Sequence, residues 1–206
     1  MKWRIRCISY KKIDRKVNET TNQNTQKSNY TLSQYERGIS SEMIALFTQT
    51  FSDSEGEAEG KTIGLLVGDL LTTTSDQELK GFVAKQGDRL IAGVLFTPLS
   101  FENGEVGYLL SPMATLTECQ GKGVGQALIN FGLEHLKQQG IELVFTYGDP
   151  NFYSRVGFQQ VTEAQFKAPH TLSFPHGWLA QSLAGELTPI QGTSSCVQGL
   201  DSPAYW

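Results

Sequence analysis

The sequence lacks any long apolar run, and its cysteines are few. No stretch of about 18 consecutive apolar residues occurs, so no segment has the length that a membrane-spanning helix needs. The three cysteines, Cys7, Cys119 and Cys196, are scattered and form no C-x-x-C pair. This spacing offers no disulfide framework and favours a reducing compartment. We therefore expect a cytoplasmic protein that does not bind a membrane.

Positive charge is scarce outside the first 29 residues. Residues 1–29 hold eight Lys and Arg against two acidic residues, a local charge of +6, whereas the remainder holds nine basic against nineteen acidic residues, or -10. A body this acidic disfavours nucleic-acid binding and suits a cationic amine, although solvated surface acids explain the charge equally well. Residues 1–29 have neither a periodic apolar face nor the apolar core of a secretory signal. We expect them to form a disordered extension.

A glycine-rich turn followed by an amphipathic helix occupies residues 119–140. Alternating glycines at Gly121, Gly123 and Gly125 allow the backbone to turn tightly and to direct several N–H groups at one spot. Apolar residues then recur at helical spacing, and Gly140 stands where a left-handed C-cap is expected. Unsatisfied N–H groups at a helix N-terminus bind anions such as phosphates. The stretch thus predicts a pyrophosphate-binding loop that leads into a helix packed on a sheet.

The spacing of this loop differs from two common phosphate-binding motifs. A P-loop needs G-x-x-x-x-G-K-[ST], but Lys122 is followed by Gly123, which has no hydroxyl for magnesium. A dinucleotide fingerprint needs G-x-G-x-x-G, whereas the run here is G-x-G-x-G, and no βαβ unit with a ribose-binding acid follows it. The loop instead matches Q-x-x-G-x-G, beginning at Gln120.

The patterns on either side of the loop predict a mixed α/β domain. Three strands in a row precede the loop, and a short, largely apolar run follows the helix, which is the order of an antiparallel meander feeding a βαβ unit. An acidic, glycine-broken loop at residues 52–60 is expected to separate two earlier helices. The final residues, 186–206, are poorly patterned and are expected to wrap the surface. The predicted strands span 31–35, 79–85, 89–99, 105–115, 141–147, 171–174 and 178–183, and the two early helices span 40–51, with a cap at Ser40, and 63–71.

A second motif follows the apolar run. Residues 148–158 read GDPNFYSRVGF, and the F-Y-x-R-x-G-F part matches the pattern Y-x-[KR]-x-G-F. The two motifs lie about 30 residues apart, with one helix and one strand between them. In this order they resemble the two signatures of the GNAT superfamily of CoA-dependent N-acetyltransferases. The S-P-M-A run before the glycine loop is most similar to the YhbS-like branch. The resemblance covers residues 30–187 in outline and is specific in 109–125 and 144–158.

This resemblance implies the fold and the reaction. The fold would be α/β (an α+β mixed sheet), the acyl-CoA N-acyltransferase fold of the family, with an antiparallel meander and a βαβ unit whose parallel strands splay apart. Residues 30–187 would form the GNAT domain, and residues 188–206 a C-terminal wrapping tail. Acetyl-CoA would be the acyl donor, used without a metal to acetylate a primary amine by direct transfer.

The resemblance also implies roles for the residues of this chain that match the family's two motifs. Acetyl transfer needs a fixed donor, a deprotonated amine, a stabilised oxyanion and a protonated thiolate. Tyr153 matches the usual general acid toward the CoA sulfur, because a phenol is protonated at neutral pH. The matching donor-binding residues are Met113, Ala114 and Thr115, through backbone groups, and Gln120, Gly121, Lys122, Gly123, Val124 and Gly125 at the pyrophosphate.

The acceptor side is less determined. In the superfamily the early helix pair walls the acceptor site, which makes the acids of residues 52–60 candidates for holding a cation. A small-molecule amine and a protein lysine both remain open as acceptor, and so does a homodimer as the oligomeric state. No residue identifies itself as the general base. The histidines show no metal-ligand spacing. Candidate acids on the acceptor wall are Asp53, Glu55, Glu57 and Glu59, and candidate bases are Glu105, Ser111, Asp149 and a water molecule.

Two rival functions also fit the sequence. The first is a CoA- or acyl-CoA-binding sensor or partner protein without turnover, which the missing base keeps open. The second is an acyltransferase that uses a hydroxyl acceptor or a longer acyl chain.

Overall fold

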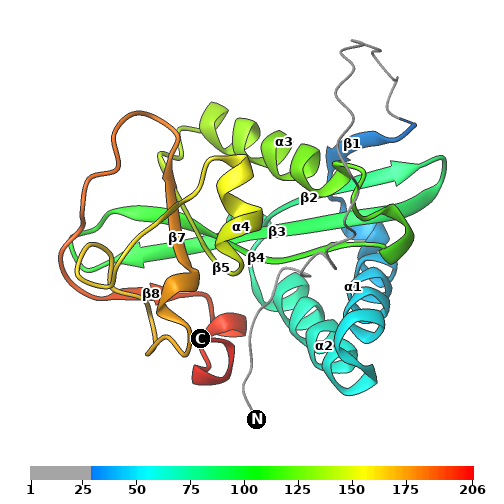
Figure 1. Cartoon of the computed structure of the whole chain (residues 1–206), viewed down its shortest axis with the longest axis horizontal. Coiled ribbons are helices and arrows are strands. Elements are labelled where there is room, and N and C mark those ends of the chain that lie inside the picture. The colour runs from blue at the N-terminus through cyan, green and yellow to red at the C-terminus, as the bar shows by residue number, and fades with distance from the viewer. Residues whose placement is uncertain (1–28) are drawn as a thin grey trace, which may run out of the picture.

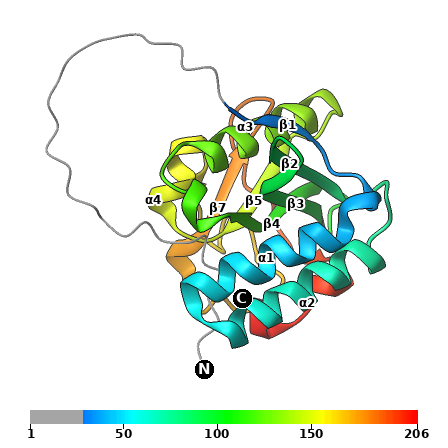
Figure 2. The ribbon, with the colours of Figure 1, turned by 90° about the vertical axis from the view of Figure 1, so that its right-hand side faces the viewer.

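The computed structural model describes residues 29–206, so the extension expected over residues 1–29 lies outside the described part except for Asn29. Two helix layers enclose one mixed sheet (Figures 1 and 2). No helix within residues 29–206 combines the length and apolarity needed to cross a membrane. The strands are β1 (Thr31–Gln34), β2 (Lys80–Gln86), β3 (Arg89–Phe101), β4 (Val106–Thr115), β5 (Leu143–Tyr147), β6 (Gln159–Gln160), β7 (Trp178–Ser182) and β8 (Ser194–Cys196), and the α-helices are α1 (Ser40–Glu55), α2 (Glu57–Thr73), α3 (Val124–Gln138) and α4 (Pro150–Tyr153).

The sheet has the order β1-β2-β3-β4-β5-β7-β6, and β8 pairs with the end of β3. Every strand pair is antiparallel except β4 and β5, which run parallel and are joined through α3. This arrangement confirms the meander that feeds a βαβ unit. The crossover brings the start of α3 to the carboxyl end of β4, so the glycine loop lies at that edge of the sheet.

The two faces of the sheet are covered by different helices, as Figure 2 shows. A Cβ built on Gly93 of β3 would meet Met43 and Phe47 of α1, so the odd-numbered residues of β3 face α1. A Cβ on Gly132 of α3 would meet Phe82 of β2 and Phe96 of β3, so the even-numbered residues of β3 face α3. The sheet therefore has an α1 face and an α3 face.

The prediction of an acidic loop over residues 52–60 is wrong. Helix α1 continues to Glu55 and α2 starts at Glu57, so a single residue, Gly56, connects them at a φ of +100°. The acidic residues here are good helix formers, and one glycine in the left-handed region suffices to turn the chain. Side chains at Gly60 and Gly64 would collide with α1, so these glycines allow the two helices to pack closely.

Two further local predictions fail. Ser40 does not cap α1, because its hydroxyl donates to Arg37 O and pairs with Tyr35 Oη, while Ile39 occupies the N-cap position. Residues 171–174 form no strand, because Phe174 N–H donates to the Tyr147 hydroxyl instead of to a strand partner.

The C-terminal residues cover the α1 face of the sheet beyond α2. Figures 1 and 2 both show this red segment beside α2. Strand β8 extends the sheet along β3, and Leu200 and Trp206 are buried. The Trp206 ring stacks on Tyr147 at 6.2 Å between centroids and meets Trp178 edge-on at 6.0 Å.

Candidate functional site

Strands β4 and β5 separate part-way along their length. They pair at only three positions, the last joining Leu110 to Thr146, and beyond Leu110 strand β4 pairs with β3 alone. At the same point β4 contains one extra residue, a β-bulge at Ser111 and Pro112 opposite Leu95. The last five residues of β4 therefore border an opening in the sheet on the side where β5 has left.

The glycine loop closes the carboxyl end of this opening. Gly121 and Gly123 adopt left-handed φ values of +74° and +79°, which only glycine reaches easily. The Gln120 side chain donates from Nε2 to Thr115 O at 3.0 Å and thereby ties the loop to the end of β4. The first backbone bond of α3 runs from Ala127 N–H to Gly123 O, which leaves the preceding N–H groups at the helix N-terminus without an intrahelical acceptor.

A hollow lies between this loop, the end of β4 and α4. Its empty space is about 440 Å³, part of it open to solvent. Gly125 lets α3 approach β4, since a Cβ there would lie 2.5 Å from Met113 Cε and 3.2 Å from Thr115 Oγ1. Thr115 Oγ1 is buried with no hydrogen-bond partner among residues 29–206. The hollow thus offers N–H groups, a helix N-terminus and a hydroxyl to an elongated anionic ligand. Its lining is Met113, Thr115, Cys119, Gln120, Gly121, Gly123, Val124, Gly125, Gln126 and Phe152.

Seven of the nine donor-binding residues expected from the sequence line this hollow. The other two are Ala114, whose side chain is buried on the α1 face opposite Gly93, and Lys122, which is exposed at the rim. Sequence reasoning missed Cys119, Gln126 and Phe152. The positions of Cys119 and Gln126 beside the motif were the available signal, whereas Phe152 reaches the hollow only through the tertiary fold.

Tyr153 lies at the end of α4, directly after the carboxyl end of β5. Asp149 caps this short helix by accepting from Asn151 N–H at 2.9 Å. The Tyr153 ring is 3% exposed and packs edge-on against Phe152 at 5.2 Å and Phe158 at 5.6 Å between centroids. Phe152 lines the hollow, so the tyrosine predicted as general acid is next in sequence to its wall.

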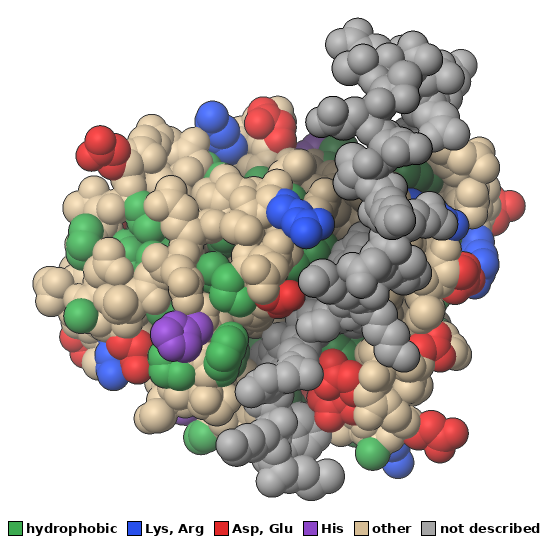
Figure 3. Space-filling model, viewed as in Figure 1, with side chains coloured by type: hydrophobic (Ala, Val, Ile, Leu, Met, Phe, Trp, Pro, Cys, Tyr) green, Lys and Arg blue, Asp and Glu red, His purple; other side chains and the backbone are tan. Residues whose placement is uncertain are grey.

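The acids expected at the acceptor wall differ in their surroundings. Figure 3 shows acidic side chains gathered over the part of this face that α1 and α2 form. Asp53, Glu55 and Glu57 are exposed, and Asp53 accepts from Thr117 Oγ1 at 2.9 Å, which ties the end of α1 to the segment after β4. Glu59 is half-buried, and this burial raises the pKa of its carboxyl.

The candidate bases are also separated by the structure. Glu105 accepts from Asn103 Nδ2 at 2.9 Å just before β4 begins, about 20 Å along the strand from the bulge. It therefore lies at the wrong end of β4. Asp149 is engaged as the cap of α4, and Ser111 is at the bulge itself.

The histidines lie apart from one another. His135 is half-buried against Phe131, with 4.2 Å between ring centroids, and His170 Nε2 pairs with Asp201 Oδ1 at 2.7 Å. Within residues 29–206, no three or more His, Cys, Asp or Glu side chains gather in a way that would hold a metal ion.

Comparison with known proteins assigns the family. The acetyltransferase (GNAT) domain model matches residues 77–160, which include β4, the glycine loop and the Tyr153 motif. An uncharacterised N-acetyltransferase of Escherichia coli, YjhQ, is 32% identical over 138 residues, which cover 64% of this chain and 76% of YjhQ. The chain belongs to the GNAT family. A second relative, YhbS of Escherichia coli, is 29% identical over 122 residues, which cover 56% of this chain and 65% of YhbS, and the GNAT protein described here falls in this YhbS-like branch.

Solved GNAT structures share the fold. The crystal structure of Escherichia coli YhbS in complex with CoA superposes with a TM-score of 0.70 at 24% identity, covering 84% of this chain and 92% of YhbS. A GNAT acetyltransferase from Brucella melitensis in complex with acetyl-CoA gives a TM-score of 0.66 at 20% identity, covering 84% of this chain and 98% of that protein. These likenesses confirm the GNAT fold expected from the two motifs, and family membership makes this chain an acyltransferase.

Proposed function

We propose that this GNAT protein transfers an acetyl group from acetyl-CoA directly to a primary amine. The observation that carries the proposal is the hollow between the glycine loop and the opened edge of β4, where Thr115 Oγ1 is buried without a partner among the described residues. Two structures of the same fold were crystallised with CoA or acetyl-CoA. We assign this catalytic domain to residues 30–187, with residues 188–206 as a tail that wraps it.

The residues of the hollow fit the parts of this donor. The N–H groups from Gln120 to Gly125 would bind the pyrophosphate at the start of α3, with Lys122 adding positive charge from the rim. Beyond the point where β5 leaves β4, the backbone of Met113, Ala114 and Thr115 would hydrogen-bond the amide-bearing arm of CoA as a strand does. Ala114 takes part through its backbone, so its side chain on the α1 face does not conflict with this role.

Tyr153 would protonate the departing thiolate. In the transfer, the amine nitrogen forms a bond to the thioester carbon, the carbon–sulfur bond breaks, and the sulfur takes a proton from the Tyr153 hydroxyl. The nitrogen gives up one proton to water, and a proton from water restores the Tyr153 phenol. The support for this role is the position of Tyr153 beside Phe152, where β5 ends next to the opening. Rings on two sides hold the phenol in place.

Calorimetric titration with acetyl-CoA and desulfo-CoA tests the donor site. Gly123→Glu places a carboxylate in the open space of the cradle, where no atom lies within 4 Å of a built Cβ. We expect at least about 100-fold weaker binding, or about 2.7 kcal/mol, because the carboxylate would lie against the phosphates.

Gly140→Glu is the matched control. Gly140 has the same φ of +79° and the same open surroundings, but it lies after the opposite end of α3. Both variants carry the same backbone strain and the same charge, so only the position of the carboxylate differs. Equal affinity in the two variants, or no binding of either ligand by the wild type, would refute the proposed donor site.

A further inference from the structure

Cys119 is a nucleophile in the donor hollow that the proposed acetyl transfer does not use. It is a free cysteine, 8% exposed, and it belongs to the lining of the hollow. Thr115 belongs to the same lining and is equally buried, and its Oγ1 has no hydrogen-bond partner among residues 29–206. A buried hydroxyl without a partner in the wall of a hollow indicates that a ligand binds there. The Cys119 thiol thus lies beside the place where a ligand is expected.

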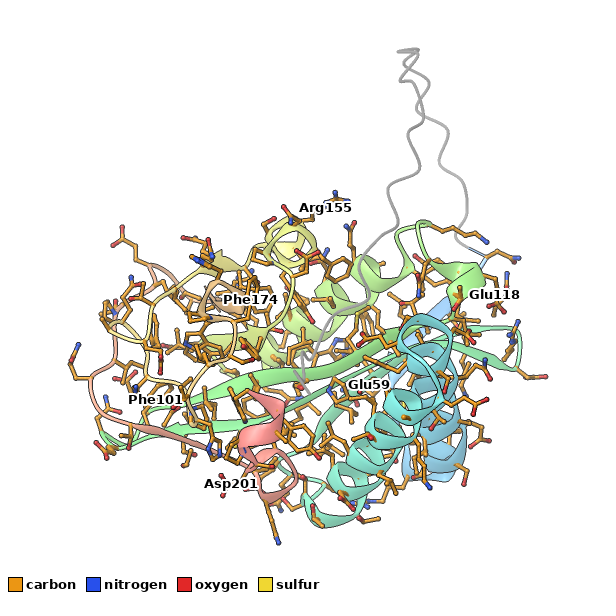
Figure 4. The ribbon with its side chains drawn as sticks, turned by 60° about the horizontal axis from the view of Figure 1, so that its bottom comes forward. Glu59, Phe101, Glu118, Arg155, Phe174 and Asp201 are labelled. Atoms are coloured by element: carbon orange, nitrogen blue, oxygen red, sulfur yellow. The ribbon has the colours of Figure 1, made fainter. Side chains whose placement is uncertain are left out.

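The turn after β4 holds Cys119 on its inner side. The two residues before it, Thr117 and Glu118, are exposed, whereas Cys119 is buried. Thr117 Oγ1 donates to Asp53 of α1 at 2.9 Å, and Arg89 of β3 donates to Glu118 at 2.6 Å. Figure 4 shows Glu118 at the outside of the molecule, on the segment that joins β4 to α3. Both contacts hold the turn from its outer side, so the thiol remains on the side of the hollow.

The hollow around this thiol favours anions. The N–H groups of the glycine loop and the N-terminal end of α3 border it, and Lys122 lies exposed at its rim. The carboxylates of Asp53 and Glu118 are engaged on the outer side of the turn. An anionic reagent should therefore reach Cys119 more readily than a neutral reagent of equal reactivity.

Cys196 provides a comparison within the same chain. It is half-buried in β8, opposite Leu99 of β3, and does not belong to the lining of the hollow. Burial raises the pKa of the Cys196 thiol to about 11, and the Asp201 carboxylate adds to the rise. Because the thiolate is the form that attacks a disulfide, Cys196 should react slowly at neutral pH and show no preference for an anionic reagent.

We propose that Cys119 is a modification site, at which an anionic low-molecular-weight disulfide forms a mixed disulfide that excludes acetyl-CoA from the hollow. The identity of the excluded ligand rests on the proposed function. The Cys119 thiol loses its proton to water, and its thiolate attacks one sulfur of the reagent. A new sulfur–sulfur bond forms, the reagent's own sulfur–sulfur bond breaks, and the departing thiolate takes a proton from water. Cys119 is oxidised and half of the reagent is reduced, so an added thiol reverses the step.

The test uses the full chain with the substitutions Cys7→Ser and Cys196→Ser, which leave Cys119 as its one cysteine. Dithiobis(nitrobenzoate) is the anionic probe and dithiodipyridine the neutral one, and each releases a coloured thiol that gives the labelling rate. Calorimetry gives the Kd of desulfo-CoA, which has no thiol of its own. Labelling by the anionic probe is expected to raise this Kd at least about 100-fold, and dithiothreitol is expected to restore it.

Protection by the ligand gives a quantitative check. If label and donor exclude one another, desulfo-CoA at about ten times its Kd should slow the labelling of Cys119 about 11-fold. The ratio of the anionic to the neutral rate should be at least about 10-fold higher for Cys119 than for Cys196, measured in a chain with Cys7→Ser and Cys119→Ser. Comparing the two ratios removes the intrinsic reactivity of the probes. Cys119→Ala treated with either probe should keep the Kd that it had before treatment.

The outcomes separate this inference from the donor site. Cys119 that is labelled in urea but not in the folded protein would overturn the inference alone. So would labelling at the same rate with and without bound desulfo-CoA, equal rate ratios at the two cysteines, or a labelled protein whose circular dichroism shows that it has unfolded. Failure of the untreated protein to bind desulfo-CoA would overturn the proposed function together with this inference.

Discussion

Gly125→Ala tests whether the hollow beside α3 is the donor site. The residue lies in the first turn of α3, and an added methyl would lie 2.5 Å from Met113 Cε and 3.2 Å from Thr115 Oγ1. The nearest obstacle is the end of a flexible methionine side chain, which can move at small cost. It moves, however, within the wall of the hollow, so the expected damage is to ligand binding.

The magnitude follows from comparison with Gly132→Ala in the same helix. Alanine gains about 0.5–1 kcal/mol over glycine inside a helix, and overpacking a core costs about 1–3 kcal/mol. A Cβ at Gly132 would lie 2.9 Å from ring atoms of both Phe82 and Phe96, which are fixed in the core. We therefore expect Gly132→Ala to lose about 1–2 kcal/mol of stability and Gly125→Ala to lose close to none.

The effect on desulfo-CoA binding should be larger in Gly125→Ala than in Gly132→Ala, the reverse of the effect on stability. Gly125→Ala narrows the hollow and should weaken desulfo-CoA about 10-fold, or about 1.4 kcal/mol, whereas Gly132→Ala should bind as the wild type does. Urea denaturation measures the free energy of unfolding of each variant, and calorimetric titration measures its Kd for desulfo-CoA. Wild-type affinity in Gly125→Ala would refute the assignment of this hollow to the donor. A larger stability loss in Gly125→Ala than in Gly132→Ala would refute the packing argument.

Two further predictions concern the tyrosine and the C-terminal segment. Tyr153→Phe keeps the ring between Phe152 and Phe158 but removes the acid, so kcat should fall about 10²- to 10⁴-fold at an unchanged Kd for desulfo-CoA. An unchanged kcat would exclude the acid role. Wild-type protein that binds desulfo-CoA but shows no turnover would favour a CoA-binding sensor. Trp206→Ala removes a ring that is 4% exposed and stacked on Tyr147, so urea denaturation should show that the free energy of unfolding falls by about 3–5 kcal/mol. A fall below about 1 kcal/mol would mean that the C-terminal segment does not stabilise the sheet.

Much of the fold could be predicted because its signals are local and periodic. The apolar run that became β5 and the three strands before the glycine loop have patterns that burial on a sheet imposes. The errors arose where a single residue or a distant partner decides the structure. Gly56 alone turns α1 into α2, and Tyr147 captures the backbone of Phe174 that a strand would have used. Such contacts leave no periodic trace.

Some residues of the candidate site could also be predicted from local sequence patterns, whereas others could not. The glycine loop is a continuous segment, so its spacing indicated most of the residues that line the hollow. Phe152 lies 27 residues after Gly125, and only the parallel pairing of β4 with β5 brings it to the wall. The position of Ser111 depends on the bulge in β4 and on the face of the sheet to which each β4 side chain points. Neither can be deduced from composition or spacing, so the sequence offered Ser111 only as one of several bases.

The bulge in β4 gives a physical account of how this strand can belong to the sheet and also border the donor hollow. Without the bulge, β4 would continue beside β5, and its backbone would hydrogen-bond to β5 along the rest of the strand. The extra residue instead lies where β4 leaves β5, and from there the strand leads toward the start of α3. Side chains on the α3 face then border the donor hollow, and Ser111 faces the opposite side. On the proposed function, the thioester of the donor would lie at this opened edge of β4, beside the start of α3.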